Sequence, residues 1–465
     1  MILALVAALA IVVQDHASVR AAPKSSATEL TTLWQGDVLE IRGESAGYVK
    51  VYNYRRERGG YLKSEAVRPV AFNEANTPEL LAILRFLRDT PGSEALGISY
   101  GAAYLQAVPT SALTAEPFDA IGRMAERLAD DASGNHTGLT DVAAHIEVIE
   151  QFGIHMRSFE RNGRMQVCYD GELFRRVLSL ASATSEERAH AALGLTRPDC
   201  IDSNIGPLQR ASLDAERREL LDMIEEGGLS AMTRSRLHSR RAGVWASLTF
   251  EQARRRELAA PAAQRALAEL LAVNPNDLGD DRRSEYLDAV VRVGAIRWAA
   301  ITPAPQTGPL TLSASAGDPG QTCIALEDAR LKTALVRRCT YGIVWMASAH
   351  AIPQGPALVL AVQPLESWRE LWVFHRSAGT WAIDVLSPGA DDPEEGYVEF
   401  AGLTPRTRRL LIAREVKDHG RFRRRFEELR LDDLALLQQA SAPELLPDFG
   451  RWQDVAWRRD TLALR

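Results

Sequence analysis

The sequence predicts a multidomain α+β protein, and three changes of pattern along its 465 residues lead to this prediction. Short β-type runs separated by glycine-containing turns fill residues 14–70. Helical periodicity follows over residues 71–301, where we expect an irregular α-helical domain. A connector rich in proline and glycine then introduces strand patterns over residues 302–465. Because this length exceeds what one hydrophobic core usually serves, we expect three separate domains.

The composition is that of an ordinary globular protein. Apolar residues make up 46% of the chain and charged residues 25%, which excludes wholesale disorder and a polytopic membrane protein. The formal net charge of −6 gives no electrostatic reason to expect a nucleic acid or an anionic membrane as partner. The one dense basic run, residues 420–433, alternates arginine with phenylalanine and ends in acidic residues, which is typical of a solvated strand. We therefore expect no nucleic-acid partner.

The chain opens with the apolar run MILALVAALAIVV, residues 1–13. Such a run is too short to cross a bilayer as a helix but has the length of a signal-peptide core. We therefore expect a periplasmic or secreted protein that loses this segment and has no transmembrane span in its mature chain. No Lys or Arg precedes the run, which an upstream start codon would explain. The alternative is a buried first strand, against which stands the lack of polar alternation.

Four cysteines fit an oxidising compartment, because their spacing suggests two local pairs. Cys323 and Cys339 lie equally far from Leu331 in a predicted hairpin, so they would face each other across two antiparallel strands at disulfide distance. Cys168 and Cys200 flank a predicted helix, and the sequence leaves open whether they are bonded. The four thiols form no CxxC pattern, so we expect neither a metal site nor a cofactor.

The β-type runs of the first domain follow a recognisable order. They are SVRAAP (residues 18–23), LWQGDVLEI (33–41), GYVKV (47–51) and GYLKSEAV (60–67). Together these runs resemble the opening, the central strands and the closing strand of a bacterial SH3-like domain, over residues 18–70. Tyr48 and Tyr61 stand where that family usually has tryptophan, and Ala22 stands where its first glycine is common.

The resemblance implies a small β-barrel that is placed in the bacterial envelope and binds peptidoglycan or a protein. Aromatic side chains can stack on sugar rings or line a peptide groove, so Tyr48, Tyr52, Tyr54 and Tyr61 are the candidate ligand-binding residues. For Tyr48 and Tyr61 we favour the alternative role of filling the barrel core. Tyr52 and Tyr54 share one strand face, and they are the pair that we expect to be exposed.

One catalytic motif occurs in the helical region. GISYG, residues 97–101, matches the G-x-S-x-G nucleophile elbow of serine hydrolases, with Ser99 as the nucleophile. The elbow must follow a buried strand, whereas PGSEAL precedes it here and helical segments follow. We therefore interpret this stretch as a helix in which Gly97 and Gly101 let another helix approach closely.

A second candidate for catalysis is a pair of side chains on a predicted helix. Asp141 and His145 lie four residues apart on one face, where the acid could orient the histidine as a general base. A surface contact or a core histidine is the commoner role of such a pair. The motifs of metalloproteases, penicillin-binding proteins, P-loop proteins and dinucleotide-binding proteins are absent from the sequence.

The C-terminal region contains a weak internal repeat. Residues 347–362 align with the neighbourhood of residues 400–415, so that Pro353 meets Pro405, Leu358 meets Leu410 and Ala361 meets Ala413. A fainter third copy begins at Leu310. The unit resembles a blade of a β-propeller, in which a turn with proline precedes a hydrophobic strand. A short or incomplete propeller and an ordinary β-sandwich are the two expected outcomes.

Two functions from different classes remain. The first is an exported, non-catalytic cell-envelope protein that uses the SH3-like module and the β-rich domain to bind peptidoglycan or protein. The second is an envelope hydrolase with its active site in the helical region and the SH3-like domain as targeting module. The missing catalytic signatures favour the first. The hydrolase requires Ser99, His145 or His155 to meet an acid in one cleft within hydrogen-bond reach.

Overall fold

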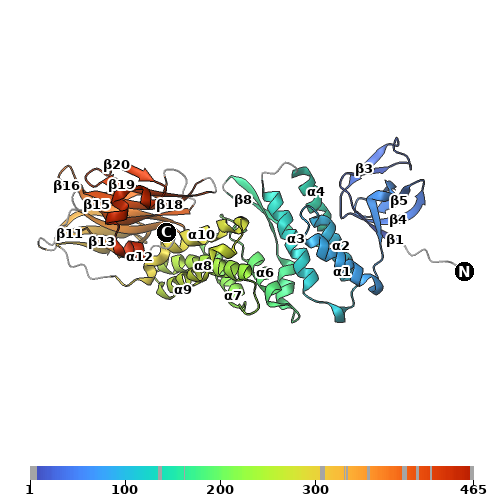
Figure 1. Cartoon of the computed structure of the whole chain (residues 1–465), viewed down its shortest axis with the longest axis horizontal. Coiled ribbons are helices and arrows are strands. Elements are labelled where there is room, and N and C mark those ends of the chain that lie inside the picture. Colours follow the sequence, from blue (N-terminus) through green and yellow to red (C-terminus); the bar gives the residue numbers. More distant parts are fainter. Residues whose placement is uncertain are drawn as a thin grey trace. The chain divides into compact units, whose positions relative to one another are not determined.

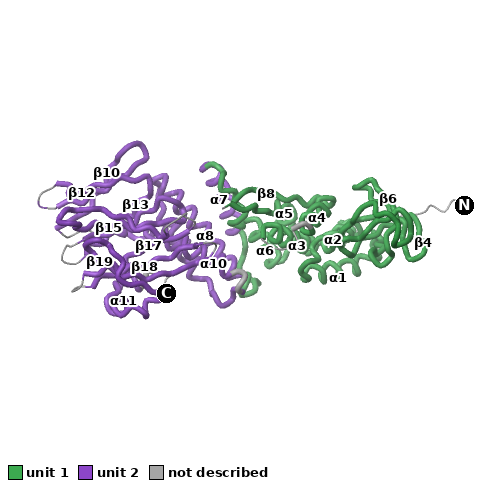
Figure 2. The backbone as a smooth tube through the Cα atoms, turned by 90° about the horizontal axis from the view of Figure 1, so that it is seen from above, with its two compact units in different colours: residues 1–206, 223–233 green, residues 207–222, 234–465 purple. Residues whose placement is uncertain are grey.

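The computed structural model is mixed α+β, with sheets at both ends of the chain and helices between them (Figure 1). The described residues are 8–134, 139–161, 163–303, 309–328, 330, 333–352, 357–389, 395–404, 408–418 and 421–460. Two compact units divide the chain (Figure 2). Unit 1 comprises Met1–Gly206 and Met223–Thr233, and unit 2 comprises Pro207–Asp222 and Arg234–Arg465.

Unit 1 begins with a seven-stranded sheet in the order β3-β2-β6-β5-β4-β1-β7. Its strands are β1 (Ala8–Val12), β2 (Ala17–Arg20), β3 (Glu29–Leu33), β4 (Val38–Ser45), β5 (Tyr48–Asn53), β6 (Arg58–Lys63) and β7 (Val67–Val70). Its core is aliphatic and includes Leu33, Leu39, Val49 and Leu62. Short strands broken by glycine turns therefore form one sheet, as the sequence predicts.

Strand β1 corrects the interpretation of the N-terminal apolar run. Residues 8–12 pair with β4 on one side and with β7 on the other, so they lie inside the sheet. Ala10 and Val12 point into the core of the sheet, while Ile11 packs against the helices that follow. Because both faces of β1 are covered, no polar alternation is expected of it. The alternative of a buried first strand therefore holds for residues 8–12, and the first domain begins before residue 14.

The rest of unit 1 is largely helical, with one hairpin that the sequence analysis missed. Its helices are α1 (Thr77–Arg88), α2 (Glu94–Ala107), α3 (Glu116–Ser133), α4 (Leu139–Glu150), α5 (Glu172–Ser179) and α6 (Ser185–Leu195). The hairpin of β8 (Met156–Arg161) and β9 (Arg164–Tyr169) lies between α4 and α5. A disulfide joins Cys168 at the end of β9 to Cys200 after α6, which settles the pairing that the sequence left open.

The GISYG stretch lies within α2, and its glycines face α3. A Cβ atom added at Gly97 would lie 2.4 Å from the sulfur of Met124, and one added at Gly101 would lie 2.6 Å from Cγ1 of Ile121. Contacts this short do not occur between real side chains, so the two helices can approach only where both positions lack a side chain. The predicted close approach of a second helix is confirmed.

Unit 2 contains four longer helices, which are α7 (Pro207–Asp222), α8 (Ala231–Arg254), α9 (Ala260–Ala272) and α10 (Asp280–Ile296). Two short helices end the described chain, α11 (Pro447–Trp452) and α12 (Val455–Asp460). Among the described residues between α10 and α11, the chain forms three groups of strands. The first is a three-stranded sheet of β10 (Leu310–Ala316), β11 (Thr322–Asp328) and β12 (Thr333–Thr340).

The other two groups are four-stranded meanders. The first meander consists of β13 (Ile343–Ala351), β14 (Ala357–Leu365), β15 (Trp368–Ser377) and β16 (Thr380–Leu386). The second consists of β17 (Glu395–Leu403), β18 (Arg409–Asp418), β19 (Arg421–Arg430) and β20 (Leu436–Ala440). Parallel pairing of Trp368 and Arg369 with Gly396 and Tyr397 joins the two meanders into one sheet.

The strand register bears out the internal repeat. Ala351 pairs with Leu358 in the first meander, and Leu403 pairs with Leu410 at the equivalent position of the second. Pro353 and Pro405, which the alignment also matched, lie outside the described residues. The repeated unit is therefore a complete meander.

Buried side chains show that the three groups of strands stack face to face. Leu360 on one face of β14 packs with Ile324 of the three-stranded sheet. Val359 on the opposite face packs with Ile412 of the second meander. Leu411 on the far face of that meander packs against α8, α9 and α10. Face-to-face packing is what propeller blades do, but here helices cover the face against which a further blade would pack.

The disulfide of Cys323 and Cys339 lies in the three-stranded sheet. The two residues are directly opposite each other in the antiparallel register of β11 and β12. This is the arrangement that their equal distance from the hairpin centre predicts, although Leu331 itself lies outside the described residues. The disulfide therefore links two neighbouring strands of the three-stranded sheet.

Buried charges connect the helices of unit 2 to the meanders. Arg292 of α10 donates hydrogen bonds to Glu366 at 3.0 Å and to Glu395 at 2.9 Å. One helical turn away, Asp288 accepts a bond from Lys417 at 2.9 Å. Burial raises the pKa of Asp288 above its ordinary range, and the nearby charge of Glu395 raises it further. Asp288 thus keeps its proton to a higher pH than an exposed aspartate does.

We expect Gly101→Ala to lower the free energy of unfolding by about 1–3 kcal/mol, because the new methyl group overlaps the buried Ile121. Gly243 of α8 is a matched control, since a Cβ there would meet only Ala289 at 4.0 Å. Gly243→Ala should stabilise by about 0.5–1 kcal/mol through helix propensity. Chemical denaturation measures both. Equal effects of the two substitutions would contradict the helix-packing role of Gly101.

We expect Asp288→Asn to change how stability depends on pH. When the pH rises above about 4, the unfolded Asp288 ionises while the folded one keeps its proton, so the wild type loses stability until the folded group ionises too. The variant lacks this loss. The melting temperature of the variant minus that of the wild type should therefore increase from pH 4 to pH 8. Each kcal/mol of relative stability corresponds to about 2–4 °C in this difference. Calorimetry at several pH values decides this, and a wild type that gains on the variant as the pH rises would refute it.

Candidate functional site

The outer face of strands β5 and β6 gathers the candidate tyrosines. Val49 and Val51 point into the core, so Tyr48 and Tyr52 point the other way. Tyr61 of β6 lies opposite Lys50 and therefore shares this outer face. We call Tyr48, Tyr52, Tyr54 and Tyr61 the tyrosine face.

Exposure differs among the four tyrosines. Tyr54 is 64% exposed, and its ring centroid lies 5.0 Å from that of the half-buried Tyr52. The exposure expected for this pair is therefore found for Tyr54, whereas Tyr52 is half-buried like the other two tyrosines. Tyr48 and Tyr61 are half-buried and do not belong to the aliphatic core. The core role that we favoured for these two is wrong, because they alternate with the residues that fill the core.

An arginine and a glutamate contact Tyr52 and Tyr54. The guanidinium carbon of Arg42 lies 4.0 Å from the ring centroid of Tyr52 and 6.0 Å from that of Tyr54. Arg42 donates a hydrogen bond to Glu40 at 2.7 Å, and the Tyr54 hydroxyl donates one to the same carboxylate oxygen at 3.0 Å. These two bonds lower the pKa of Glu40. The result is an ordered aromatic and cationic surface.

A second cluster lies where the sheet of unit 1 meets α4. Nε2 of His145 lies 2.7 Å from Oδ1 of Asp15, in the loop after β1. Nε2 of His16 lies 3.5 Å from Oδ1 of Asp141, one turn away on α4. Asp141 and His145 therefore each contact the loop after β1 rather than each other. Two neighbouring residues of the loop and two of the helix form crossed Asp–His pairs.

Further contacts enclose this cluster. The ring of Trp34 lies 4.3 Å from that of His16 and 6.1 Å edge-on from that of His145. Gln35 donates hydrogen bonds to Oδ2 of Asp15 at 3.1 Å and to the carbonyl of Gly92 at 2.9 Å. Burial alone would raise the pKa of Asp15, but the hydrogen bond and charge of His145 hold it below its ordinary value. The cluster therefore fastens the sheet to the helices with an ionised carboxylate.

Ser99 is not arranged as a nucleophile. Its side chain is buried, and its hydroxyl donates to the carbonyls of Gly36 at 2.7 Å and of Ala95 at 3.0 Å. His145 contacts Asp15 and Gln35, and His155 is exposed elsewhere on unit 1. The structure thus brings His145 to an acid but does not bring either to the Ser99 hydroxyl.

Sequence reasoning missed Asp15, His16, Trp34 and Gln35 as partners of the helical pair. The first two belong to the run QDHASVR, directly before the SH3-like pattern, and the other two lie within LWQGD. Their partners are more than a hundred residues away in the chain, as for Asp15 and His145. No local spacing could show this contact. Only the double occurrence of Asp and His, as neighbours and again four residues apart, hints at it.

No family model, curated protein or solved structure matches this chain. In the part of the chain that the structure describes, no three His, Cys, Asp or Glu side chains are grouped so as to hold a metal ion. Within the same residues, no helix has both the length and the apolarity that a membrane span requires.

We expect Asp15→Asn to destabilise unit 1 at pH 7 by about 1 kcal/mol, because it removes the carboxylate that pairs with His145. The folded pKa of Asp15 is lowered, so its contribution is present above about pH 4 and is lost as the pH falls through the folded value. The gap between variant and wild type should therefore close in acid. Thermal melts between pH 3 and pH 7 measure it.

Asp141→Asn is the matched control for this prediction. It breaks the other crossed pair, whose His16 and Asp141 side chains are 64% and 43% exposed. Exposed pairs contribute little, so this variant should cost less than Asp15→Asn. A larger cost for Asp141→Asn, or a gap that stays constant with pH, would contradict the role given to Asp15.

Proposed function

We propose that this protein is a non-catalytic binding protein of the bacterial cell envelope, and that the tyrosine face of its N-terminal domain binds peptidoglycan. The observation that carries the proposal is the exposed Tyr54, which contacts the half-buried Tyr52 edge-on beside the guanidinium of Arg42. Tyrosine offers a large, rigid contact area at a low cost in conformational entropy. We propose an SH3-like barrel as the fold that presents it.

The chemistry of this face suits a cell-wall ligand. Peptidoglycan combines sugar rings, whose apolar faces stack on aromatic side chains, with short peptides that carry carboxylates. Arg42 and the exposed Lys50 and Lys63 supply positive charge around the tyrosines. The positive charge of Arg42 is already balanced by Glu40, and Lys63 contacts Glu65 at 3.2 Å. We therefore expect a carboxylate of the ligand to pair with Lys50 first.

Two disulfides support a location outside the cytoplasm. Disulfides persist in oxidising compartments such as the periplasm, and each unit of this chain contains one. Since residues 8–12 are a strand of the sheet, the proposal requires an export signal that lies N-terminal to Ala8. Cleavage after residue 13 would also remove β1, which pairs with strands on both sides.

The hydrolase remains the weaker alternative. Of the candidate residues Ser99, His145 and His155, His145 contacts an acid, but it is 9% exposed and its Nε2 faces Asp15. The Ser99 hydroxyl is buried and donates to main-chain carbonyls. A hydrolase would have to use other residues than these, whereas the binding function uses a surface that is already accessible.

The proposal is tested by co-sedimentation of the purified, oxidised protein with peptidoglycan sacculi. Point variants are preferable to deletion of the first domain, because a deletion of residues 14–70 would leave β1 without β4 and β7. We expect Tyr52→Ala together with Tyr54→Ala to reduce the bound fraction at least fivefold. Aromatic contacts of this kind contribute about 1 kcal/mol or more each.

Tyr341→Ala is the matched control, since Tyr341 is 67% exposed and lies in unit 2. It should bind sacculi like the wild type. Equal binding by the double variant and the control would reject the tyrosine face as the wall-binding surface. Failure of the wild type itself to sediment with sacculi would reject peptidoglycan as the ligand.

A further inference from the structure

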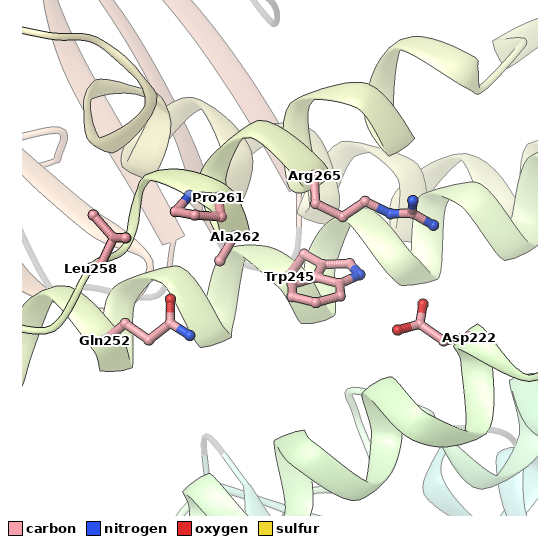
Figure 3. Close-up of a pocket in the computed structure, with 7 residues that line it drawn as sticks. All are labelled: Asp222, Trp245, Gln252, Leu258, Pro261, Ala262 and Arg265. Atoms are coloured by element: carbon pink, nitrogen blue, oxygen red, sulfur yellow. The ribbon is translucent and has the colours of Figure 1, made fainter.

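Unit 2 contains an open pocket of about 650 Å³ between α7, α8 and α9, but its side chains are largely engaged by the protein itself (Figure 3). The guanidinium carbon of Arg218 lies 6.0 Å from the ring centroid of Trp245, and Arg265 donates to Glu269 at 2.6 Å. The amide oxygen of Gln252 is buried, out of reach of a ligand. A more distinctive surface of unit 2 is one edge of its eight-stranded sheet.

Strand β20 forms this edge and is open to solvent. It is the last strand in the order of the sheet, and β19 is its only partner among the described strands (Figure 1). Four of its five residues are exposed, including Leu436 at 52% and Leu437 at 37%. The main-chain groups along its outer side are therefore accessible to a further strand.

The edge at β20 lacks features that commonly protect sheet edges. Charged side chains, proline and capping of the main chain keep edge strands from pairing with other chains. In unit 1, the carbonyls of Leu30 and Thr32 on the edge strand β3 accept hydrogen bonds from arginine side chains. The opposite edge of that sheet, β7, contains Pro69. Strand β20 has neither a charged residue nor a proline in its sequence, LLQQA, so it is suited to pairing with another strand.

Opposite charges flank the two ends of β20. Asp432 and Asp433 precede the strand, and their side chains are 61% and 49% exposed. At the other end, β20 pairs only with residues 426–429 of β19, so residues 421–425 of β19 extend past it. The exposed residues of this extension are Arg421, Arg423 and Arg425. The edge is therefore acidic beyond one end of β20 and basic beyond the other.

This polarity selects an antiparallel partner with the same order of charges. A second copy of β20 satisfies this condition, because the acidic end of each copy then lies toward the arginines of the other. A parallel copy would instead bring acid to acid and arginine to arginine. Asp432 and Asp433 already contact Arg408 at 3.4 Å and Arg430 at 2.8 Å, but exposed ion pairs of this kind contribute little and leave the acids able to make a further contact.

We propose that two copies of this chain pair through β20, antiparallel and across a two-fold axis at Gln438, the middle residue of the strand. At this register Leu436 of each copy lies opposite Ala440 of the other, and the two large sheets become continuous. Each chain has one tyrosine face, so the dimer has two and binds a polymeric ligand with higher avidity. This last consequence alone rests on the function proposed above.

The test is sedimentation velocity of the full, oxidised chain over a range of concentrations. Gln438→Lys and Gln438→Glu each place like charges directly opposite each other, so each should weaken the dimer about three- to thirtyfold. An equimolar mixture of the two variants brings opposite charges together, and its affinity should return to within about threefold of the wild type. Ser315→Lys is the matched control on an exposed strand position of the three-stranded sheet, and it should dimerise like the wild type.

Dimers that weaken in both Gln438 variants, recover in the mixture and persist in the control support the proposal, provided that the variants melt like the wild type. A wild type that stays monomeric at every concentration overturns it, and leaves the edge to residues 461–465 of the chain or to a different protein. Undiminished dimers of Gln438→Lys overturn it too, because another surface then forms the interface. Weakened dimers that do not recover in the mixture reject the two-fold pairing. These measurements use no sacculi, so their outcome is independent of the wall-binding experiment.

Discussion

The structure of unit 1 depends on a strand with two buried faces. Ala10 and Val12 of β1 fill the core of the sheet, while Ile11 packs on the helices. The main-chain carbonyl of Val12 accepts a hydrogen bond from the N–H of Gly36 at 2.8 Å, which fixes the turn at Gly36. Gly36 has a φ of 93°, and a Cβ there would lie 2.6 Å from the carbonyl oxygen of Ala95. The contact of Asp15 with Gln35 and His145 lies directly beside this close docking.

Sequence patterns predicted those parts of the fold whose determinants are local. The equal spacing about Leu331 predicted the bond between Cys323 and Cys339, and glycines four residues apart predicted a helix packed closely on another. The pattern failed where burial was decided by distant segments. Residues 8–12 show no alternation because the helices cover their second face, and alternation is the signal that distinguishes a half-exposed strand. Tyr48 and Tyr61 were assigned to the core from family likeness, although neighbours such as Val49 fill it.

The buried ion pair of Arg369 and Glu399 could not be predicted from the sequence. Arg369 is fully buried at the junction of the two meanders, where it donates to Glu399 at 2.7 Å and to the main-chain carbonyl of Gly294 at 2.6 Å. Glu399 also accepts from Trp457 of α12 at 2.9 Å. A sequence pattern gives no sign of such a bond, because the partners come from separate elements. A buried ion pair of this kind is costly to form and more costly to break, so it favours one arrangement of these elements over others.

The two ends of the stack in unit 2 are unlike each other. One end is a three-stranded sheet with a disulfide, and the other is a layer of helices. Each meander between them has four strands and packs on its neighbour through hydrophobic residues. Duplication or loss of a whole meander would therefore preserve both end surfaces and change only the thickness of the middle. In this architecture a further meander could be inserted between the two end layers without altering them, whereas a layer added at the helical end would have to displace the helices.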